Sequence, residues 1–370
     1  MSKLIILIIC TVLFSLILAD EPKKCRILSL EGGGDKGAYQ AGGIHALVNG
    51  LPAEDVAYDV VSGISIGSLN ALIMAVHEIG DEKHAADTLL EEWRHITGGN
   101  YIFRQWPWGG VIRGFYFETG LFDTTPAKQN IAEILSGHNG LKRTLVIGAV
   151  DAETGDYQVF DNADLQGNDR ISGGVMSSGA YPVVFPLNLW DKKYWMDGGV
   201  KRALDIGSAI HQCEDKGFTE EDIIVDVVLC GIKTMANVDP TTLRPLSVLQ
   251  RYLQIADFDK AMSSLEDTFF YFPKVTMRYV IAPTKKLPSS VIPLEFSPED
   301  IEVMIKMGQE DAKAVLGQGP GVNFHELLKK YSPRKEKEDF YRRRNKKKPT
   351  ENKVEEKVEE KVEEKVKLLQ

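Results

Sequence analysis

The chain has 370 residues, of which 43% are hydrophobic and 26% charged, and these values are ordinary for a globular protein with a sizeable core. Its formal net charge is −9, although residues 334–367 contain 14 basic and 10 acidic side chains. The rest of the chain is therefore strongly acidic, which argues against general nucleic-acid binding.

Residues 1–19 have the pattern of a secretory signal peptide. Lys3 precedes a long apolar run, and Ile17 and Ala19 suit the −3 and −1 positions for cleavage before Asp20. An uncleaved membrane anchor is the alternative, because the apolar run is long for a signal peptide. The signal peptide predicts a secreted protein or one in the lumen of the secretory pathway.

Apolar, β-branched runs alternate with segments of helical periodicity along the chain. The predicted strands span 25–31, 58–61, 144–150, 157–160 and 223–232, and the predicted helices span 38–50, 69–79, 84–96 and 249–268. Each of the first two strands is followed by a glycine-rich turn and a helix. This order is typical of parallel βαβ units and predicts an α/β sandwich.

The stretch LEGGGDKG at residues 30–37 has two interpretations. Gly32, Gly34 and Gly37 satisfy the dinucleotide-binding pattern G-x-G-x-x-G. That site also needs an acidic residue at the end of the second strand, where this chain has a serine turn instead. We therefore favour an oxyanion hole, in which backbone N–H groups face a developing negative charge.

That serine turn is Gly63-Ile64-Ser65-Ile66-Gly67, a G-x-S-x-G sequence between a predicted strand and a predicted helix. Glycines on both sides of Ser65 permit the sharp turn of a nucleophile elbow. The positive end of the following helix favours loss of the hydroxyl proton. Ser65 is therefore the candidate nucleophile.

Two residues are candidates for the base that a serine nucleophile needs. Asp197 follows an apolar-aromatic run and precedes two glycines, so it is either a carboxylate presented at a strand end or an ordinary turn residue. Partial burial would raise its pKa toward the value that a general base requires. His325 comes late in the chain, as in many α/β-hydrolases, but its surroundings predict the start of a helix.

Cys25, Cys213 and Cys230 remain after removal of the predicted signal peptide. Nothing in their spacing identifies a disulfide pair, so we expect buried free thiols rather than a disulfide. The spacing of cysteine and histidine residues suits no metal ion, and we expect neither a metal nor a cofactor.

Four motifs in the order EGGGDKG, GISIG, SSGAYPVVFPL and YWMDGGV resemble those of the patatin-like phospholipases. The resemblance implies a three-layer α/β/α sandwich with a mostly parallel central sheet. It also implies calcium-independent hydrolysis of lipid acyl esters by a dyad of Ser65 and Asp197 without histidine. The family's glycine loop corresponds here to Gly32, Gly33, Gly34 and Gly37.

Lys36 departs from this family pattern, which usually has arginine at that position. Lysine keeps the charge but loses the planar fork that binds two oxygens at once. Lys36 is a candidate for positioning the loop or a substrate phosphate. Weakened activity would favour a lipid-binding or storage protein, and a His-dependent esterase is the other alternative.

Four aromatic residues have two interpretations. They either shape the access of acyl chains to the site or simply anchor the core and the loops. These residues are Trp106, Trp108, Phe115 and Phe117.

The predicted organisation is a signal peptide at 1–19, a patatin-like hydrolase domain at 20–332 and a charged low-complexity tail at 333–370. The tail has six cations between Arg342 and Lys348, followed by a four-residue valine repeat. We interpret it as a solvated helix or a disordered segment, with docking on an anionic membrane surface as the alternative. Membrane lipids or lipid aggregates are the expected substrate partners.

Overall fold

The computed structural model describes residues 23–96, 101–235, 237–288 and 296–331. The predicted signal peptide at 1–19 and the predicted tail at 333–370 lie outside these ranges. The described residues up to Leu327 pack as one unit, and a second unit begins at Leu328.

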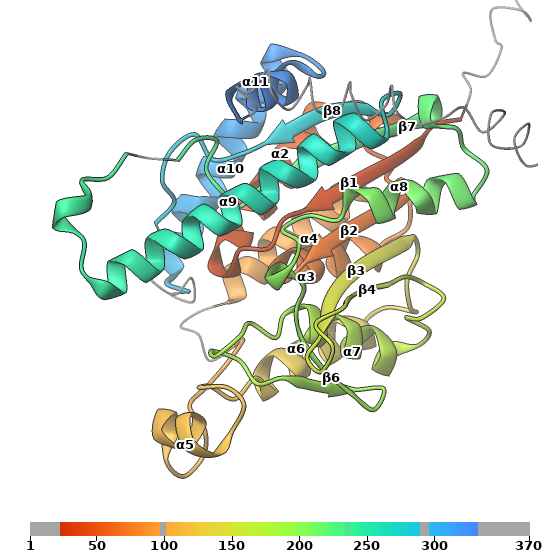
Figure 1. Ribbon diagram of the computed structural model, residues 1–370. Coiled ribbons are helices and arrows are strands. Elements are labelled where there is room, and N and C mark those ends of the chain that lie inside the picture. The colour runs from red at the N-terminus through yellow and green to blue at the C-terminus, as the bar shows by residue number, and fades with distance from the viewer. Residues whose placement is uncertain (1–22, 97–100, 236, 289–295, 332–370) are drawn as a thin grey trace, which may run out of the picture. The chain divides into compact units, whose positions relative to one another are not determined.

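Within the described residues, eight strands form one sheet in the order β5-β6-β3-β2-β1-β7-β8, with β4 paired to β3 (Figure 1). The parallel strands are β1 (Cys25–Leu30), β2 (Val60–Ile64), β3 (Thr144–Asp151), β7 (Ile223–Val228) and β8 (Thr276–Ile281). The antiparallel strands are β4 (Tyr157–Phe160), β5 (Asn188–Trp190) and β6 (Lys193–Asp197). The mostly parallel central sheet is therefore confirmed.

The parallel strands at the centre of the sheet are buried along nearly their whole length. Every residue of β2 and β3 is buried, and β1 has one partly exposed residue. A parallel strand covered on both faces needs an almost continuous apolar sequence, and this explains why these strands were recognisable as apolar runs.

Helices cover both faces of the sheet, as an α/β/α sandwich requires. Helices α2, α3, α4 and α10 pack against one another, whereas α8 packs on β1, β2, β3 and α9. In Figure 1 the long helix α9 crosses in front of the sheet. The bounds are α2 (Gly37–Gly50), α3 (Ile66–Ala75), α4 (Glu82–His95), α6 (Thr125–Ser136), α7 (Asn168–Ser178), α8 (Ile206–Asp215), α9 (Pro245–Tyr271), α10 (Pro298–Gln318) and α11 (Val322–Tyr331).

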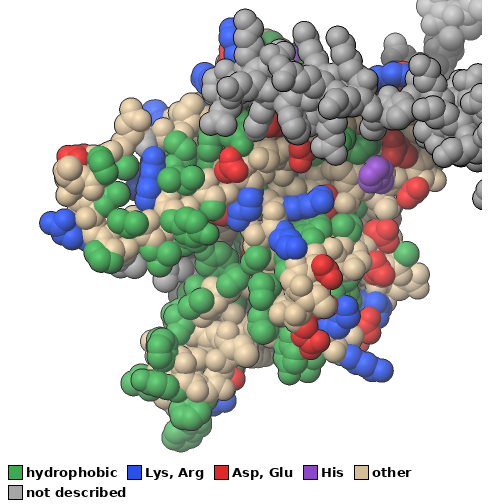
Figure 2. All heavy atoms as spheres, viewed as in Figure 1, with side chains coloured by type: hydrophobic (Ala, Val, Ile, Leu, Met, Phe, Trp, Pro, Cys, Tyr) green, Lys and Arg blue, Asp and Glu red, His purple; other side chains and the backbone are tan. Residues whose placement is uncertain are grey.

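Hydrophobic side chains lie at the surface over the short helix α5 (Gly110–Phe117) (Figure 2). Gly114 is its only buried residue. The four aromatic residues of this region are therefore divided, with Trp106 partly buried and the other three exposed.

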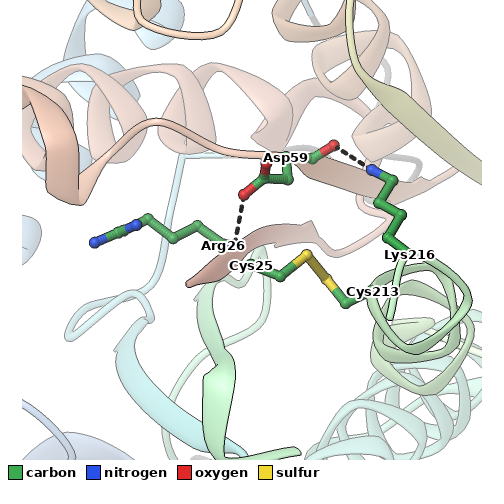
Figure 3. Close-up of a disulfide and its surroundings, with 5 residues drawn as sticks. All are labelled: Cys25, Arg26, Asp59, Cys213 and Lys216. Carbon is green, nitrogen blue, oxygen red and sulfur yellow. Dashed lines mark hydrogen bonds between the residues drawn. A yellow bond between two sulfur atoms is a disulfide. The ribbon is translucent and has the colours of Figure 1, made fainter. Parts of the chain in front are cut away.

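Cys25 and Cys213 form a disulfide that joins the first residue of β1 to α8, so the expectation of free thiols is wrong for this pair (Figure 3). The two cysteines are 188 residues apart, and no local spacing reveals such a pair. Beside the disulfide, the Arg26 N–H donates to the Asp59 carboxylate at 3.0 Å, and Lys216 donates to the Asp59 carbonyl at 3.3 Å.

No helix in the described ranges is long and apolar enough to cross a membrane. The same part of the chain contains no group of histidine, cysteine and carboxylate side chains that could hold a metal ion.

Candidate active site

Ser65 is the turn residue between β2 and α3, and its backbone is strained, with φ 54° and ψ −126°. A Cβ atom on Gly63 would lie 2.1 Å from the carbonyl oxygen of Gly67. A Cβ atom on Gly67 would lie 2.6 Å from the carbonyl oxygen of Leu30. The two glycines therefore permit the close backbone approach that the predicted nucleophile elbow requires.

Two further serines hold the strained turn in place. The Ser65 N–H donates to the Ser178 hydroxyl at 2.9 Å, and Ser178 is completely buried at the end of α7. Ser68 donates to the Ser65 carbonyl from its N–H at 2.9 Å and from its hydroxyl at 2.6 Å. Ser178 lies within SSGAYPVVFPL, but its contact with the elbow depends on the packing of α7 and was not predicted.

The register of β3 brings Asp197 to Ser65. Ile64, the last residue of β2, pairs with Gly148. Asp197, the last residue of β6, pairs with Ala149, the next residue of β3. The two strand ends therefore meet neighbouring positions of one strand, although they are far apart in the sequence.

Burial raises the pKa of Asp197 to about 6, while the Ser65 hydroxyl, the Gly199 N–H and the Lys260 ammonium each lower it. Its Oδ1 accepts the Gly199 N–H at 2.6 Å. Its Oδ2 is buried and forms no hydrogen bond of ordinary distance and angle with the residues that the structure describes. The Ser65 hydroxyl thus lowers the pKa of the Asp197 carboxyl group, although it forms no aligned hydrogen bond with Oδ2. Catalytic hydrogen bonds are often long or poorly aligned before substrate binds.

Helix α9 contributes a cation to the surroundings of Asp197. The Lys260 ammonium donates to the carbonyl of Gly199 and forms an ion pair with Asp257 at 2.8 Å. Lys260 lowers the pKa of Asp197, and Asp257 raises it. Lys260 was not predicted, because a single lysine on a long helix carries no motif.

The glycines predicted to form the oxyanion hole use their N–H groups in different ways. The Gly32 N–H donates to the carbonyl of Ala203 at 3.2 Å. The Gly37 N–H donates to the carbonyl of Gly34 within a short turn. The N–H groups of Gly33 and Gly34 have no acceptor in the described part of the chain, so they are the amides available to an oxyanion.

The loop passes so close to its neighbours that it has no space for side chains. A Cβ atom on Gly32 would lie 3.1 Å from the Ser65 Cβ. A Cβ atom on Gly33 would lie 2.4 Å from the Cβ of Cys230, which is a buried free cysteine. Gly34 has φ 63°, a conformation that favours glycine.

Replacing Gly33 with alanine is expected to lower kcat for ester hydrolysis by about 10²-fold or more, with a smaller change in KM. The new Cβ atom must move the loop away from Cys230, and the loop amides then lose their alignment. Gly33→Ala combined with Cys230→Gly removes the collision and is expected to recover part of the activity.

The matched control for this prediction is Gly317→Ala, since a Cβ atom at Gly317 meets nothing within 4 Å. Steady-state kinetics on a soluble ester compare the four proteins. Full activity in Gly33→Ala would exclude the loop from the reaction.

Glu31 fixes the start of the glycine loop. Its Oε2 accepts the N–H groups of Cys230 at 2.5 Å and Gly231 at 2.8 Å, which ties the end of β1 to the segment after β7. Burial raises the pKa of Glu31 to about 7, whereas these two hydrogen bonds and the charge of Lys36 lower it. The charge of Lys36 thus acts on Glu31, the residue that fixes the start of the loop. A role of Lys36 in binding a substrate phosphate stays a prediction.

The histidine candidate lies in different surroundings. His325 is part of α11, and its ring packs against Phe269 and Phe324. Within the described residues, no hydrogen bond of Ser65 or Asp197 involves a histidine.

A sequence model of the family described as "Patatin-like phospholipase" matches residues 28–210. The chain belongs to the patatin-like phospholipase family. The match includes the glycine loop, Ser65 and Asp197, and it ends before β7, β8 and α9. The sheet of this patatin-like protein nevertheless continues through β7 and β8, so the structural unit is larger than the matched segment.

One curated relative is named "cGAMP-activated phospholipase" and comes from Pseudomonas aeruginosa (strain BWHPSA011 / Pa011). It is 26% identical over 223 residues, which cover 56% of this chain and 62% of the relative. The chain therefore spans less than two thirds of the length of that relative. Among solved structures, the crystal structure of VipD from Legionella pneumophila is similar with a TM-score of 0.39 and 16% identity, covering 81% of this chain and 68% of that chain.

Proposed function

We propose that the protein is a lipid acyl hydrolase of the phospholipase A type that cleaves acyl esters with Ser65 and Asp197. The observation that carries the proposal is the strained Ser65 turn beside a buried carboxylate whose pKa is about 6. Membership of the patatin-like phospholipase family and the phospholipase relative support a lipid ester as the substrate.

In the proposed mechanism, Asp197 accepts the hydroxyl proton of Ser65 as its oxygen attacks the ester carbonyl. The N–H groups of Gly33 and Gly34, with that of Ile66 at the start of α3, stabilise the oxyanion. The leaving alcohol takes the proton from Asp197. A water molecule then gives a proton to Asp197, attacks the acyl-enzyme and releases the fatty acid with recovery of Ser65.

The direct test is fatty-acid release from phosphatidylcholine in detergent micelles, with galactolipid and triacylglycerol measured in parallel. Release from phosphatidylcholine is the expected result. A correctly folded protein that binds these lipids but releases no fatty acid would contradict the proposal and favour a lipid-binding or storage protein.

The value of kcat/KM is expected to rise with pH along a single ionisation near pH 6, because only the carboxylate form of Asp197 accepts a proton. Lys260→Met removes a cation that favours the carboxylate, so it should shift this profile to higher pH. Lys260→Arg keeps the charge and should show the pH profile of the wild type.

The control for the pH profile is Lys274→Met, which removes a surface lysine paired with Glu221 at 2.6 Å. A soluble ester serves as the substrate, so that lipid binding does not affect the pH dependence. A profile that is flat around pH 6, or identical profiles for Lys260→Met and Lys274→Met, would contradict the role of the Asp197 carboxylate as the base.

We also propose that the chain enters the secretory pathway, where its predicted signal peptide is removed before Asp20. The disulfide between Cys25 and Cys213 supports this location, because structural disulfides persist in oxidising compartments.

A further inference from the structure

Helix α5 and residues 108–109 before it expose many large hydrophobic side chains for so short a segment. Their exposed fractions are 95% for Trp108, 71% for Ile112, 71% for Phe115, 71% for Tyr116 and 81% for Phe117. Figure 2 shows these hydrophobic side chains gathered over α5, which is labelled in Figure 1. Large exposed hydrophobic patches on globular proteins mark sites that bind a membrane, a ligand or another protein.

The exposed side chains surround most of the helix rather than one stripe of it. At about 100° per residue, the hydrophobic positions from Val111 to Phe117 cover about 240° of the circumference of α5. Gly114 lies on the remaining side of the helix, which packs closely on the chain: a Cβ atom on Gly114 would lie 2.4 Å from the carbonyl oxygen of Leu121. A protein partner typically covers one face of a helix, whereas a lipid layer surrounds all the faces that enter it.

The charges of this segment are balanced and paired. Between residues 101 and 123 the charged side chains are two arginines and two carboxylates. Arg113 pairs with Glu118 at 2.6 Å, and Arg104 pairs with Asp123 at 2.8 Å. A surface without net charge suits an electrically neutral lipid interface and gains little from anionic headgroups.

The base of this segment is joined to the chain that forms the active site. The N–H groups of Leu121 and Phe122 donate to the carbonyls of Val183 and Val184 at 2.9 and 3.0 Å. Val183 follows shortly after Ser178, which accepts the backbone N–H of Ser65. The exposed helix is therefore connected to the Ser65 turn through a short hydrogen-bonded path.

We propose that Trp108 and α5 insert into the interfacial layer of a lipid bilayer and hold the active site at its surface. The role in lipid hydrolysis rests on the proposed function, whereas the binding itself does not. The partner is a neutral, zwitterionic lipid surface such as phosphatidylcholine. The aromatic side chains and Ile112 enter the layer, and the paired charges remain near the headgroups.

The experiment measures flotation of the full chain with vesicles of ether-linked phosphatidylcholine, which an acyl hydrolase cannot cleave. The variant Ile112→Ser/Phe115→Ser/Phe117→Ser is expected to lower the vesicle partition coefficient by at least about tenfold. Its melting temperature should change little, because the three side chains are exposed. The matched control Ile79→Ser/Val303→Ser removes hydrophobic side chains that are 44% and 47% exposed elsewhere and should bind like the wild type.

A spectroscopic measurement reports which residue enters the lipid. Brominated acyl chains are expected to quench the fluorescence of the wild type, and Trp108→Phe should remove most of this quenching. Raising the salt concentration should leave the partition coefficient nearly unchanged, since the contact is apolar. Binding that requires anionic lipid and is lost in high salt would overturn the proposal.

Hydrolysis assays separate this proposal from the proposed function. The triple serine variant should keep its activity on a soluble ester and lose at least about tenfold on phosphatidylcholine vesicles. Ser65→Ala should bind vesicles like the wild type, whether or not the protein is a hydrolase. Undiminished vesicle binding by the triple variant would overturn the proposal. Conversion of a dimer into a monomer by the same variant would also overturn it, because α5 would then contact a second copy of the chain.

Discussion

Replacing Ser65 with alanine, or Asp197 with asparagine, is expected to lower kcat/KM for ester hydrolysis by on the order of 10⁴-fold. Alanine removes the attacking oxygen, and asparagine cannot accept the hydroxyl proton. In the proposed mechanism the two residues act in one step, so the double variant should lose little more than either single variant. Steady-state kinetics on one soluble ester and one phospholipid measure the three losses.

The control for Asp197→Asn is its folding stability, which should not fall. Asparagine keeps an oxygen for the Gly199 N–H, and it removes a buried carboxyl group whose pKa is raised from 3.8 to about 6. The folded state holds that proton more tightly than the unfolded state, so this group destabilises the wild type as the pH rises from 4 to 6. Above pH 6, Asp197→Asn is expected to gain about 2–3 kcal/mol.

An Asp197→Asn protein that is both active and less stable would contradict this account of the carboxyl group. So would additive losses in the double variant, since independent effects imply that the two side chains do not share a step. Denaturation at pH 4.5 and pH 8 measures the stability difference, which should be larger at the higher pH.

Replacing both Cys25 and Cys213 with serine is expected to lower the free energy of unfolding by about 2–5 kcal/mol. The disulfide joins residues 188 positions apart, so its loss frees a large part of the unfolded chain. Both cysteines are fully buried, and the serine pair also places two hydroxyl groups in the core. Urea denaturation at equilibrium measures the difference.

Two controls isolate the bond itself. A reducing agent should destabilise the wild type and leave the double serine variant unchanged. Cys230→Ala, which alters a free cysteine, should retain the response to the reducing agent. Equal stability of oxidised and reduced wild type would show that the disulfide contributes nothing to folding.

The central strands and the site motifs were predictable because their signals are local. Strands β1, β2 and β3 are buried on both faces, so they appear in the sequence as apolar runs. The Ser65 turn lies between two glycines that permit a close backbone approach, and Asp197 ends a strand. Helix α3 begins at Ile66, three residues before its predicted start, because Gly67 packs on the backbone of β1 and shows no helical periodicity.

The other features depend on contacts between distant residues. The pairing of Cys25 with Cys213 and the contact of Lys260 with Gly199 follow from how α8 and α9 lie on the sheet. The register of β3, which joins Asp197 to Ser65, has no signature in either motif.

The glycine loop shows the same limit. Its sequence indicated four glycines for one role, whereas the structure leaves the amides of Gly33 and Gly34 available and engages those of Gly32 and Gly37. The amide of Gly32 is engaged by the carbonyl of Ala203, and that of Gly37 is engaged within the turn. These hydrogen bonds depend on the packing of the whole unit, which the motif does not encode. The exposure of α5 was equally hidden, since an apolar segment of this kind is normally part of a core.

The most direct test of the central claim is labelling with a fluorophosphonate, followed by mass spectrometry of the peptides. A serine activated by Asp197 should carry the label at Ser65, and Asp197→Asn should slow labelling by at least about 10²-fold. The Lys274→Met protein should label like the wild type. A label on another residue, or an unchanged rate in Asp197→Asn, would contradict activation of Ser65 by the carboxylate.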